Sequence, residues 1–174
     1  MLLNKRLLVV VLVAVLVAGL LVGLGNGDEA VAKEPRATIG KIVVPAAAFI
    51  PTTDNWNYDS VGWSLGMVSG SGGFTAPLSF PVPVVNIRRV TLSAYDNSGV
   101  SSACLHLERA KPLTAGSTSM MPELCTADST DHPEKVTTTA IDPRRINTVN
   151  HGPFLLVWLG PNTGLYGVQV VYSY

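Results

Sequence analysis

Two stretches of the chain alternate between apolar and polar side chains, and residues that favour a turn separate them. The stretches are VTLSAY, from Val90 to Tyr95, and ACLHLE, from Ala103 to Glu108. A period of two predicts β-strands with one apolar and one polar face. Asp, Asn, Ser and Gly between the stretches favour a chain reversal. We therefore predict a β-hairpin over residues 84–109, whose apolar face needs a second layer to cover it.

Further strand patterns on both sides of this hairpin define the fold class. The segment from Phe154 to Leu159 is apolar on both faces, which is typical of a fully buried strand. A glycine-rich linker, Ser69 to Gly73, predicts a second hairpin. Together with the first hairpin, the strand candidates are residues 38–44, 61–68, 74–80, 135–141, 154–159 and 165–174. About eight strands predict an all-β fold, an antiparallel, jelly-roll-like β-sandwich.

The closing segment places several large side chains at alternate positions. We predict that these side chains share one face of the last strand: Tyr166, Val168, Val170, Tyr172 and Tyr174. Between the two halves of the predicted sandwich, residues 110–133 are irregular and rich in Ser, Thr, Met and Pro. We expect this segment to run over the surface.

The N-terminal segment has the features of an export signal. Lys5 and Arg6 precede an uncharged apolar run from Leu7 to Leu24, and small residues follow at the A-x-A spacing of a cleavage site ending at Ala32. An uncleaved membrane anchor is the alternative, because a run of this length reaches the lower limit for crossing a bilayer. In either case residues 33–174 are expected to form a single exported domain, extracellular or at the cell surface.

Export would place the two cysteines in an oxidising compartment. Cys104 lies in the second arm of the predicted hairpin, and Cys125 follows 21 residues later. An oxidising compartment favours a disulfide between them over two free thiols. Two cysteines without C-x-x-C spacing or neighbouring histidines do not predict a metal-thiolate site.

Four segments together resemble a group of uncharacterised secreted bacterial proteins. They are VPAAAF from Val44 followed by Pro51, FTAPL from Phe74, VTL from Val90 running to YDNS, and LYGV from Leu165 ending in Tyr172. The resemblance covers most of residues 39–174 and implies a single β-sandwich domain behind a signal peptide, with no implied activity. Some members of that group have cysteines near the first loop and in the closing strand, which this chain lacks, so the disulfide is not carried over.

One motif raises the question of catalysis. Gly62-Trp63-Ser64-Leu65-Gly66 matches G-x-S-x-G, the nucleophile elbow of α/β-hydrolases. That elbow needs a strand, a sharp turn and a helix, whereas glycines and an all-β pattern follow here. A serine hydrolase is therefore only a remote alternative, and we expect no enzymatic activity.

Two groups of residues are candidates for ligand binding. Asp128, Asp131 and Glu134 offer oxygen atoms that suit calcium, although a solvated acidic loop also accounts for them. Trp56, Tyr58 and Trp63 offer aromatic faces on which a sugar ring can stack, although core or interface positions also account for them. No cofactor other than calcium is implied.

The charge balance limits the classes of partner. Twelve basic and twelve acidic side chains cancel, so no charge excess points to nucleic acid. Neutral charge and the two-sided apolar strand favour a non-enzymatic protein with a structural or self-association role. A carbohydrate-binding module is the alternative hypothesis.

Overall fold

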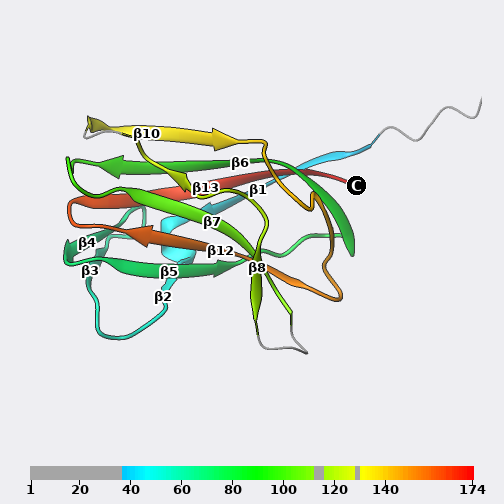
Figure 1. Ribbon diagram of the computed structural model, residues 1–174, viewed down its shortest axis with the longest axis horizontal. Coiled ribbons are helices and arrows are strands. Elements are labelled where there is room, and N and C mark those ends of the chain that lie inside the picture. The colour runs from blue at the N-terminus through cyan, green and yellow to red at the C-terminus, as the bar shows by residue number, and fades with distance from the viewer. Residues whose placement is uncertain (1–36, 112–115, 128–129) are drawn as a thin grey trace, which may run out of the picture. The chain divides into compact units, whose positions relative to one another are not determined.

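The computed structural model describes residues 37–111, 116–127 and 130–174, and these residues form two antiparallel sheets around one core (Figure 1). Sheet A has seven strands: β1 (Ile39–Pro45), β3 (Asn57–Ser60), β4 (Leu65–Ser69), β6 (Val84–Asp96), β10 (Thr130–Thr138), β11 (Arg145–Asn147) and β13 (Thr163–Ser173). Sheet B has six strands: β2 (Ile50–Pro51), β5 (Gly72–Pro77), β7 (Ala103–Ala110), β8 (Ser117–Ser119), β9 (Leu124–Cys125) and β12 (Gly152–Leu159). The predicted all-β sandwich is confirmed, but its described residues form thirteen strands instead of about eight.

Helical structure is confined to one short element in the described residues, the 3₁₀ helix η1 (Ala46–Ala48). The part of the chain that the structure describes contains no helix with the length and apolar character needed to cross a bilayer. The predicted signal peptide or anchor, residues 1–32, lies outside the described residues.

The core lies between the sheets because each strand turns its apolar face inward. Leu105 and Leu107 of β7 and Leu155 and Val157 of β12 are fully buried on the inner face of sheet B. Leu92 of β6 is buried in the same way on the inner face of sheet A. Each such side chain stabilises the fold by roughly 1.5–3 kcal/mol relative to an exposed one.

Both predicted hairpins are wrong in one respect. The strands form, but the two strands of each predicted hairpin belong to different sheets and do not pair with each other. β6 lies in sheet A and β7 in sheet B, and the glycine linker likewise joins β4 of sheet A to β5 of sheet B. The alternation of apolar and polar residues shows which side chains face the core, and it is the same for a strand in either sheet. The turn residues therefore reverse the chain across the sandwich, not within one sheet.

Two of the segments that carry the family resemblance lie side by side. β1 pairs with β13 so that Pro45 lies opposite Gly167. A Cβ atom on Gly167 would lie 2.8 Å from the carbonyl oxygen of Val44, closer than the two atoms can approach. The glycine of LYGV thus leaves room for the backbone of VPAAAF.

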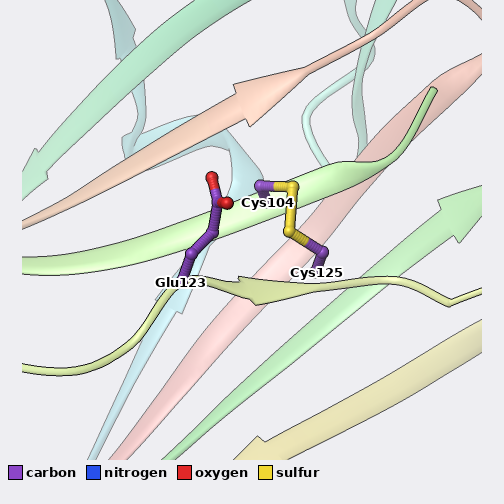
Figure 2. Close-up of side chains that lie close together, drawn as sticks. All are labelled: Cys104, Glu123 and Cys125. Atoms are coloured by element: carbon purple, nitrogen blue, oxygen red, sulfur yellow. A yellow bond between two sulfur atoms is a disulfide. The ribbon is translucent and has the colours of Figure 1, made fainter.

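The predicted disulfide joins Cys104 and Cys125. The two residues lie directly opposite each other on β7 and β9, and the carboxylate of Glu123 lies beside the sulfur atoms (Figure 2). Because the sulfurs are bonded to each other, this group offers no thiolate ligand for a metal. The disulfide fixes part of the segment expected to be irregular, in which the structure places the short strands β8 and β9.

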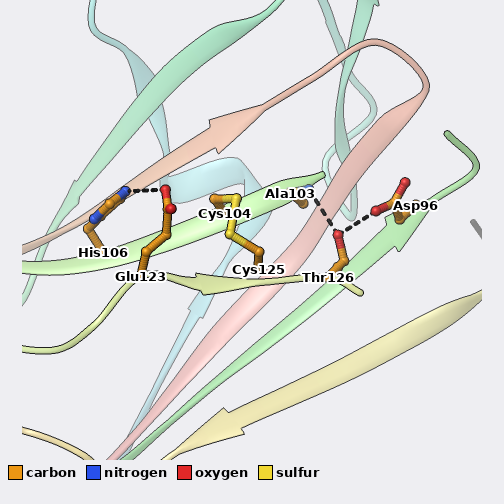
Figure 3. Close-up of a disulfide and its surroundings, with 7 residues drawn as sticks. All are labelled: Asp96, Ala103, Cys104, His106, Glu123, Cys125 and Thr126. Atoms are coloured by element: carbon orange, nitrogen blue, oxygen red, sulfur yellow. Dashed lines mark hydrogen bonds and ion pairs between the residues drawn. A yellow bond between two sulfur atoms is a disulfide. The ribbon is translucent and has the colours of Figure 1, made fainter. Parts of the chain in front are cut away.

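A buried polar network connects the end of sheet A to the start of sheet B. Asp96, the last residue of β6, is 1% exposed, and its Oδ2 accepts a hydrogen bond of 2.5 Å from the hydroxyl of Thr126 (Figure 3). The Thr126 oxygen in turn accepts a bond of 3.0 Å from the backbone N–H of Ala103, the first residue of β7. Asp96 Oδ1 accepts the N–H of Ser98 at 3.1 Å. The carboxylate thereby fixes the crossing from β6 to β7.

Candidate functional site

The turn between β3 and β4 presents a tryptophan to solvent on the outer face of sheet A. The turn closes with a hydrogen bond of 3.1 Å from Val61 N–H to the Ser64 carbonyl oxygen. Gly62 adopts a φ of 81°, which a residue with a side chain rarely adopts. Trp63 is 67% exposed, and its ring is stacked on Tyr166 of β13 with centroids 5.9 Å apart and an interplanar angle of 8°. The stack holds the indole in place and leaves much of it open.

A groove of about 230 Å³ runs beside this stack, and we call it the aromatic groove. Trp63, Tyr95 and Tyr166 supply its large side chains, and Asn162 adds an amide. Gly66 and Gly164 also line it, and they lie opposite each other on β4 and β13. Because neither residue carries a side chain, the sheet surface between the aromatic rings stays open.

A second groove of about 310 Å³ adjoins the first, and we call it the polar groove. Tyr166 lines both grooves, so they are neighbours on the outer face of sheet A. The polar groove is lined by side chains from four strands: Val43, Thr91, Ser93, Lys135 and Gln169. They offer hydroxyl, amide and ammonium groups to a ligand.

Together the two grooves combine flat aromatic surface with hydrogen-bonding groups. Tyr and Trp side chains contribute large apolar faces together with a polar atom. A ligand with an apolar face and many hydroxyl groups is complementary to this combination. Trp63 and Asn162 lie in turns, whereas strands position the other side chains named here, and strands hold side chains more precisely than loops do.

The three predicted aromatic residues do not form one platform. Tyr58 lies opposite the buried Met67 and is 38% exposed, and its ring packs edge-on against Phe74 with the ring centroids 5.3 Å apart. Trp56 is half-buried against the core. Its ring centroid lies 5.6 Å from that of Phe74 and 6.0 Å from that of Trp158. Of the three, Trp63 alone lies at the grooves.

Sequence reasoning missed the partner of Trp63. We predicted that Tyr166 shares a face with Val168, Val170 and Tyr172, but those three are buried and Tyr166 lies on the outer face. The pairing of β13 with β6 shifts between Leu165 and Gly167. This bulge inserts one residue and reverses the alternation. The glycine after Tyr166 was the available signal, because glycine within a strand often marks a bulge.

The remaining predicted residues are dispersed. Ser64 lies in the turn between two paired strands, so the strand–turn–helix context of a nucleophile elbow is not present. Asp128 and the side chain of Asp131 lie outside the described residues. Glu134 is half-buried, with one carboxylate oxygen buried and without a hydrogen-bond partner. Calcium binding by this loop stays a prediction.

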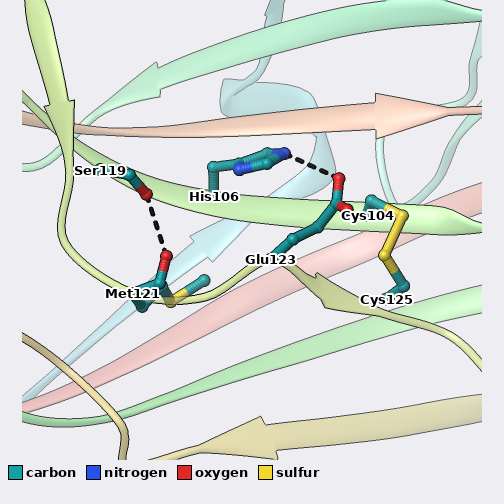
Figure 4. A network of polar contacts seen from close by, with 6 residues as sticks. All are labelled: Cys104, His106, Ser119, Met121, Glu123 and Cys125. Carbon is teal, nitrogen blue, oxygen red and sulfur yellow. Dashed lines mark hydrogen bonds and ion pairs between the residues drawn. A yellow bond between two sulfur atoms is a disulfide. The ribbon is translucent and has the colours of Figure 1, made fainter.

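The outer face of sheet B carries a smaller polar group. His106 Nε2 lies 3.0 Å from Glu123 Oε1, next to the disulfide, and the Ser119 hydroxyl donates to the Met121 carbonyl oxygen at 2.9 Å (Figure 4). Glu123 is half-exposed, so the ion pair contributes little to stability. These contacts hold the segment before β9 against β7.

Comparison with known proteins gives a likeness of fold. No family model matches the sequence, and no curated protein matches it either. A solved xylan-binding module, CBM15, is 12% identical over 77% of this chain and 97% of its own, with a TM-score of 0.48. The C-terminal CBM6 of LamC, a marine laminarinase from Zobellia galactanivorans, is 11% identical over 75% of this chain and 98% of its own, with a TM-score of 0.45. The CBM22-1–GH10 modules of xylanase 10B from Clostridium thermocellum are 8% identical over 79% of this chain and 28% of theirs, with a TM-score of 0.49.

Proposed function

We propose that this protein is an exported, non-enzymatic β-sandwich that binds carbohydrate on the outer face of sheet A. The observation that carries the proposal is the exposed indole of Trp63, stacked on Tyr166 beside the aromatic groove. A sugar ring that stacks on this indole removes apolar surface from water. Its hydroxyl groups then meet the hydrogen-bonding side chains of the polar groove.

Export is part of the proposal and rests on two features. The N-terminal segment has the composition of a signal peptide. The disulfide between Cys104 and Cys125 is typical of proteins that mature in an oxidising compartment.

The test is binding of polysaccharides by residues 33–174, which contain every described strand and the whole core. A panel of soluble polysaccharides is screened by affinity electrophoresis, and ligands that retard the protein are titrated by calorimetry. We expect Trp63→Ala to weaken binding at least about tenfold, which corresponds to 1.4 kcal/mol.

The matched control is Trp158→Ala, because Trp158 is also exposed, at 44%, but lies on β12 of sheet B. We expect this variant to bind like the unmodified protein. Binding that is equally weakened by both substitutions, or a panel in which no polysaccharide binds, would contradict the proposal.

Self-association is a second candidate function, favoured by the exposed surface of β1. Among the described residues, this strand pairs with β13 alone. Ile39 and Val43 are 73% and 59% exposed on it. An unpaired edge with apolar side chains is a template for a strand from a second copy. Light scattering of residues 33–174 over a concentration series tests this, and a monomer at every concentration, with calcium and with chelator, would exclude it.

A further inference from the structure

The outer face of sheet A collects basic side chains as well as the two grooves. Five exposed residues on this face are basic: Lys41, Arg88, Arg89, Lys135 and Arg145. Lys135 lies opposite Ser93 and lines the polar groove itself. Lys41 and Arg89 both lie opposite Val171 from its two neighbouring strands. The basic residues therefore continue along the sheet from the polar groove.

A β-bulge places two consecutive arginines on this face. The pairing of β6 with β13 shifts so that Ile87 lies opposite Tyr172 and Arg89 opposite Val171, which leaves Arg88 as the extra residue. Strict alternation would turn one of the two arginines into the core, but a bulge re-aims the side chains. Both are exposed, and Arg88 Nε donates to the Ser173 hydroxyl at 2.8 Å.

Arg145 is added to this face by β11. It lies opposite Asn86, and the next pair along, Ile146 and Val85, is buried in the core. Alternation then directs Arg145 outward, next to the arginines of β6. Its strand is short and, within the described residues, pairs with β6 alone.

None of these five residues forms an ion pair with an acidic side chain in the described part of the chain. The ion pair between His106 and Glu123 lies on sheet B. Glu134 lies opposite the buried Ala94, so its side chain is directed to the core side of the sheet, and Asp96 is buried. Asp59, opposite Gly66, lies at the end of the face near Trp63. A domain without net charge thus has one cationic surface.

We propose that the outer face of sheet A binds an anionic polysaccharide, one whose sugar rings carry carboxylate or sulfate groups. This inference rests on the proposed function and specifies its ligand. From Tyr95 to Arg89 the strand β6 rises about 20 Å, at about 3.3 Å per residue, which is long enough for several sugar rings. One sugar ring of the ligand stacks on Trp63, and acidic groups further along the polysaccharide contact Lys135 and Arg89.

The chemistry of the basic residues favours such a ligand over a neutral one. Guanidinium groups form paired hydrogen bonds to the oxygens of carboxylate and other oxyanions. Five like charges on one face also repel one another, and an anionic chain removes that repulsion. A neutral polysaccharide gains neither contribution.

The experiment compares ligands that differ in charge alone. Residues 33–174 are titrated at low ionic strength with polygalacturonate and its methyl ester, and with dextran sulfate and unmodified dextran. We expect at least one charged form to bind at least tenfold more tightly than its neutral counterpart, and the preferred pair identifies carboxylate or sulfate as the recognised group. Binding weakens as salt is added, because ions screen exposed charges.

Charge-removing variants locate the contact. We expect Lys135→Gln and Arg89→Gln each to weaken binding of the charged ligand about two- to fivefold, the range for exposed ion pairs. The matched control, Lys111→Gln, removes an exposed lysine that follows β7 of sheet B, and we expect no change. Trp63→Ala weakens binding of the same ligand.

The outcomes separate this inference from the proposed function. If the neutral and charged forms bind equally and Trp63→Ala weakens both, the carbohydrate function holds and the anionic ligand is refuted. If no polysaccharide binds, both fail. If a thymidine oligonucleotide binds as tightly as the charged polysaccharide, or if binding does not depend on Trp63, unspecific attraction of polyanions replaces the proposed site.

Discussion

Replacing Asp96 with alanine tests whether the buried network holds the two sheets in register. The carboxylate is 1% exposed and accepts two hydrogen bonds, from the Thr126 hydroxyl and the Ser98 N–H. In Asp96→Ala both donors lose their acceptor. A buried donor without a partner costs about 1–3 kcal/mol.

The structure narrows this magnitude. Thr126 is 3% exposed, so the cost of leaving its hydroxyl without an acceptor is placed in the middle of this range. The Ser98 amide is close to a polar pocket of about 370 Å³ that Asp96, Ser98 and Ser101 line, so water can reach it at lower cost. We expect Asp96→Ala to lower the free energy of unfolding by about 2–4 kcal/mol. Asp96→Asn keeps one acceptor oxygen and is expected to cost roughly half as much.

The assay is equilibrium unfolding of residues 33–174 in urea, followed by tryptophan fluorescence. Asp59→Ala is the matched control, because Asp59 is an exposed acid on the same sheet with no hydrogen bond to its side chain, and we expect a change within about 0.5 kcal/mol. If Asp96→Ala is as stable as this control, the network does not stabilise the connection from β6 to β7 and the reasoning is refuted.

Three further predictions concern stability and are measured by the same unfolding assay. Replacing both Cys104 and Cys125 with alanine opens a loop of 21 residues and is expected to cost about 3 kcal/mol, while reduction of the unmodified protein has the same effect; equal midpoints with and without reductant would contradict this. Leu105→Ala leaves a cavity in the fully buried core and is expected to cost about 2–5 kcal/mol, and a smaller loss would show that the core collapses around it. Gly167→Ala forces a methyl group to within 2.8 Å of the Val44 oxygen and is expected to lower the free energy of unfolding by about 1–3 kcal/mol. An unchanged urea midpoint would show that β1 shifts to make room for the methyl group.

Local side-chain patterns predicted the strands well and their partners poorly. The alternation over residues 90–95 and 103–108 identified β6 and β7. The two-sided apolar segment identified β12, but the prediction of a fully buried strand was wrong, because Trp158 on its outer face is 44% exposed. Whether a turn joins strands in one sheet or across the sandwich depends on contacts distant in sequence. Asp96 meets Thr126, thirty residues away, and no local pattern records that contact.

Bulges explain why the alternation of side chains misplaces Tyr166 of the candidate site and Arg88 of the basic face. Tyr166 and Arg88 both lie where the pairing of β13 with β6 shifts by one residue, so strict alternation assigns them to the wrong face. Short strands were missed for a different reason. β2 and β9 contain two residues each, too few to show a period.

The position of β13 determines when sheet A can assemble. This strand is the last along the chain, yet it lies inside the sheet, between β6 on one side and β1 with β4 on the other. During synthesis, β1 can pair only after a segment about 120–135 residues further along has emerged, and β6 lacks its longest partner until β13 emerges. Pairing between strands at such separations is slow, in the range of milliseconds to seconds.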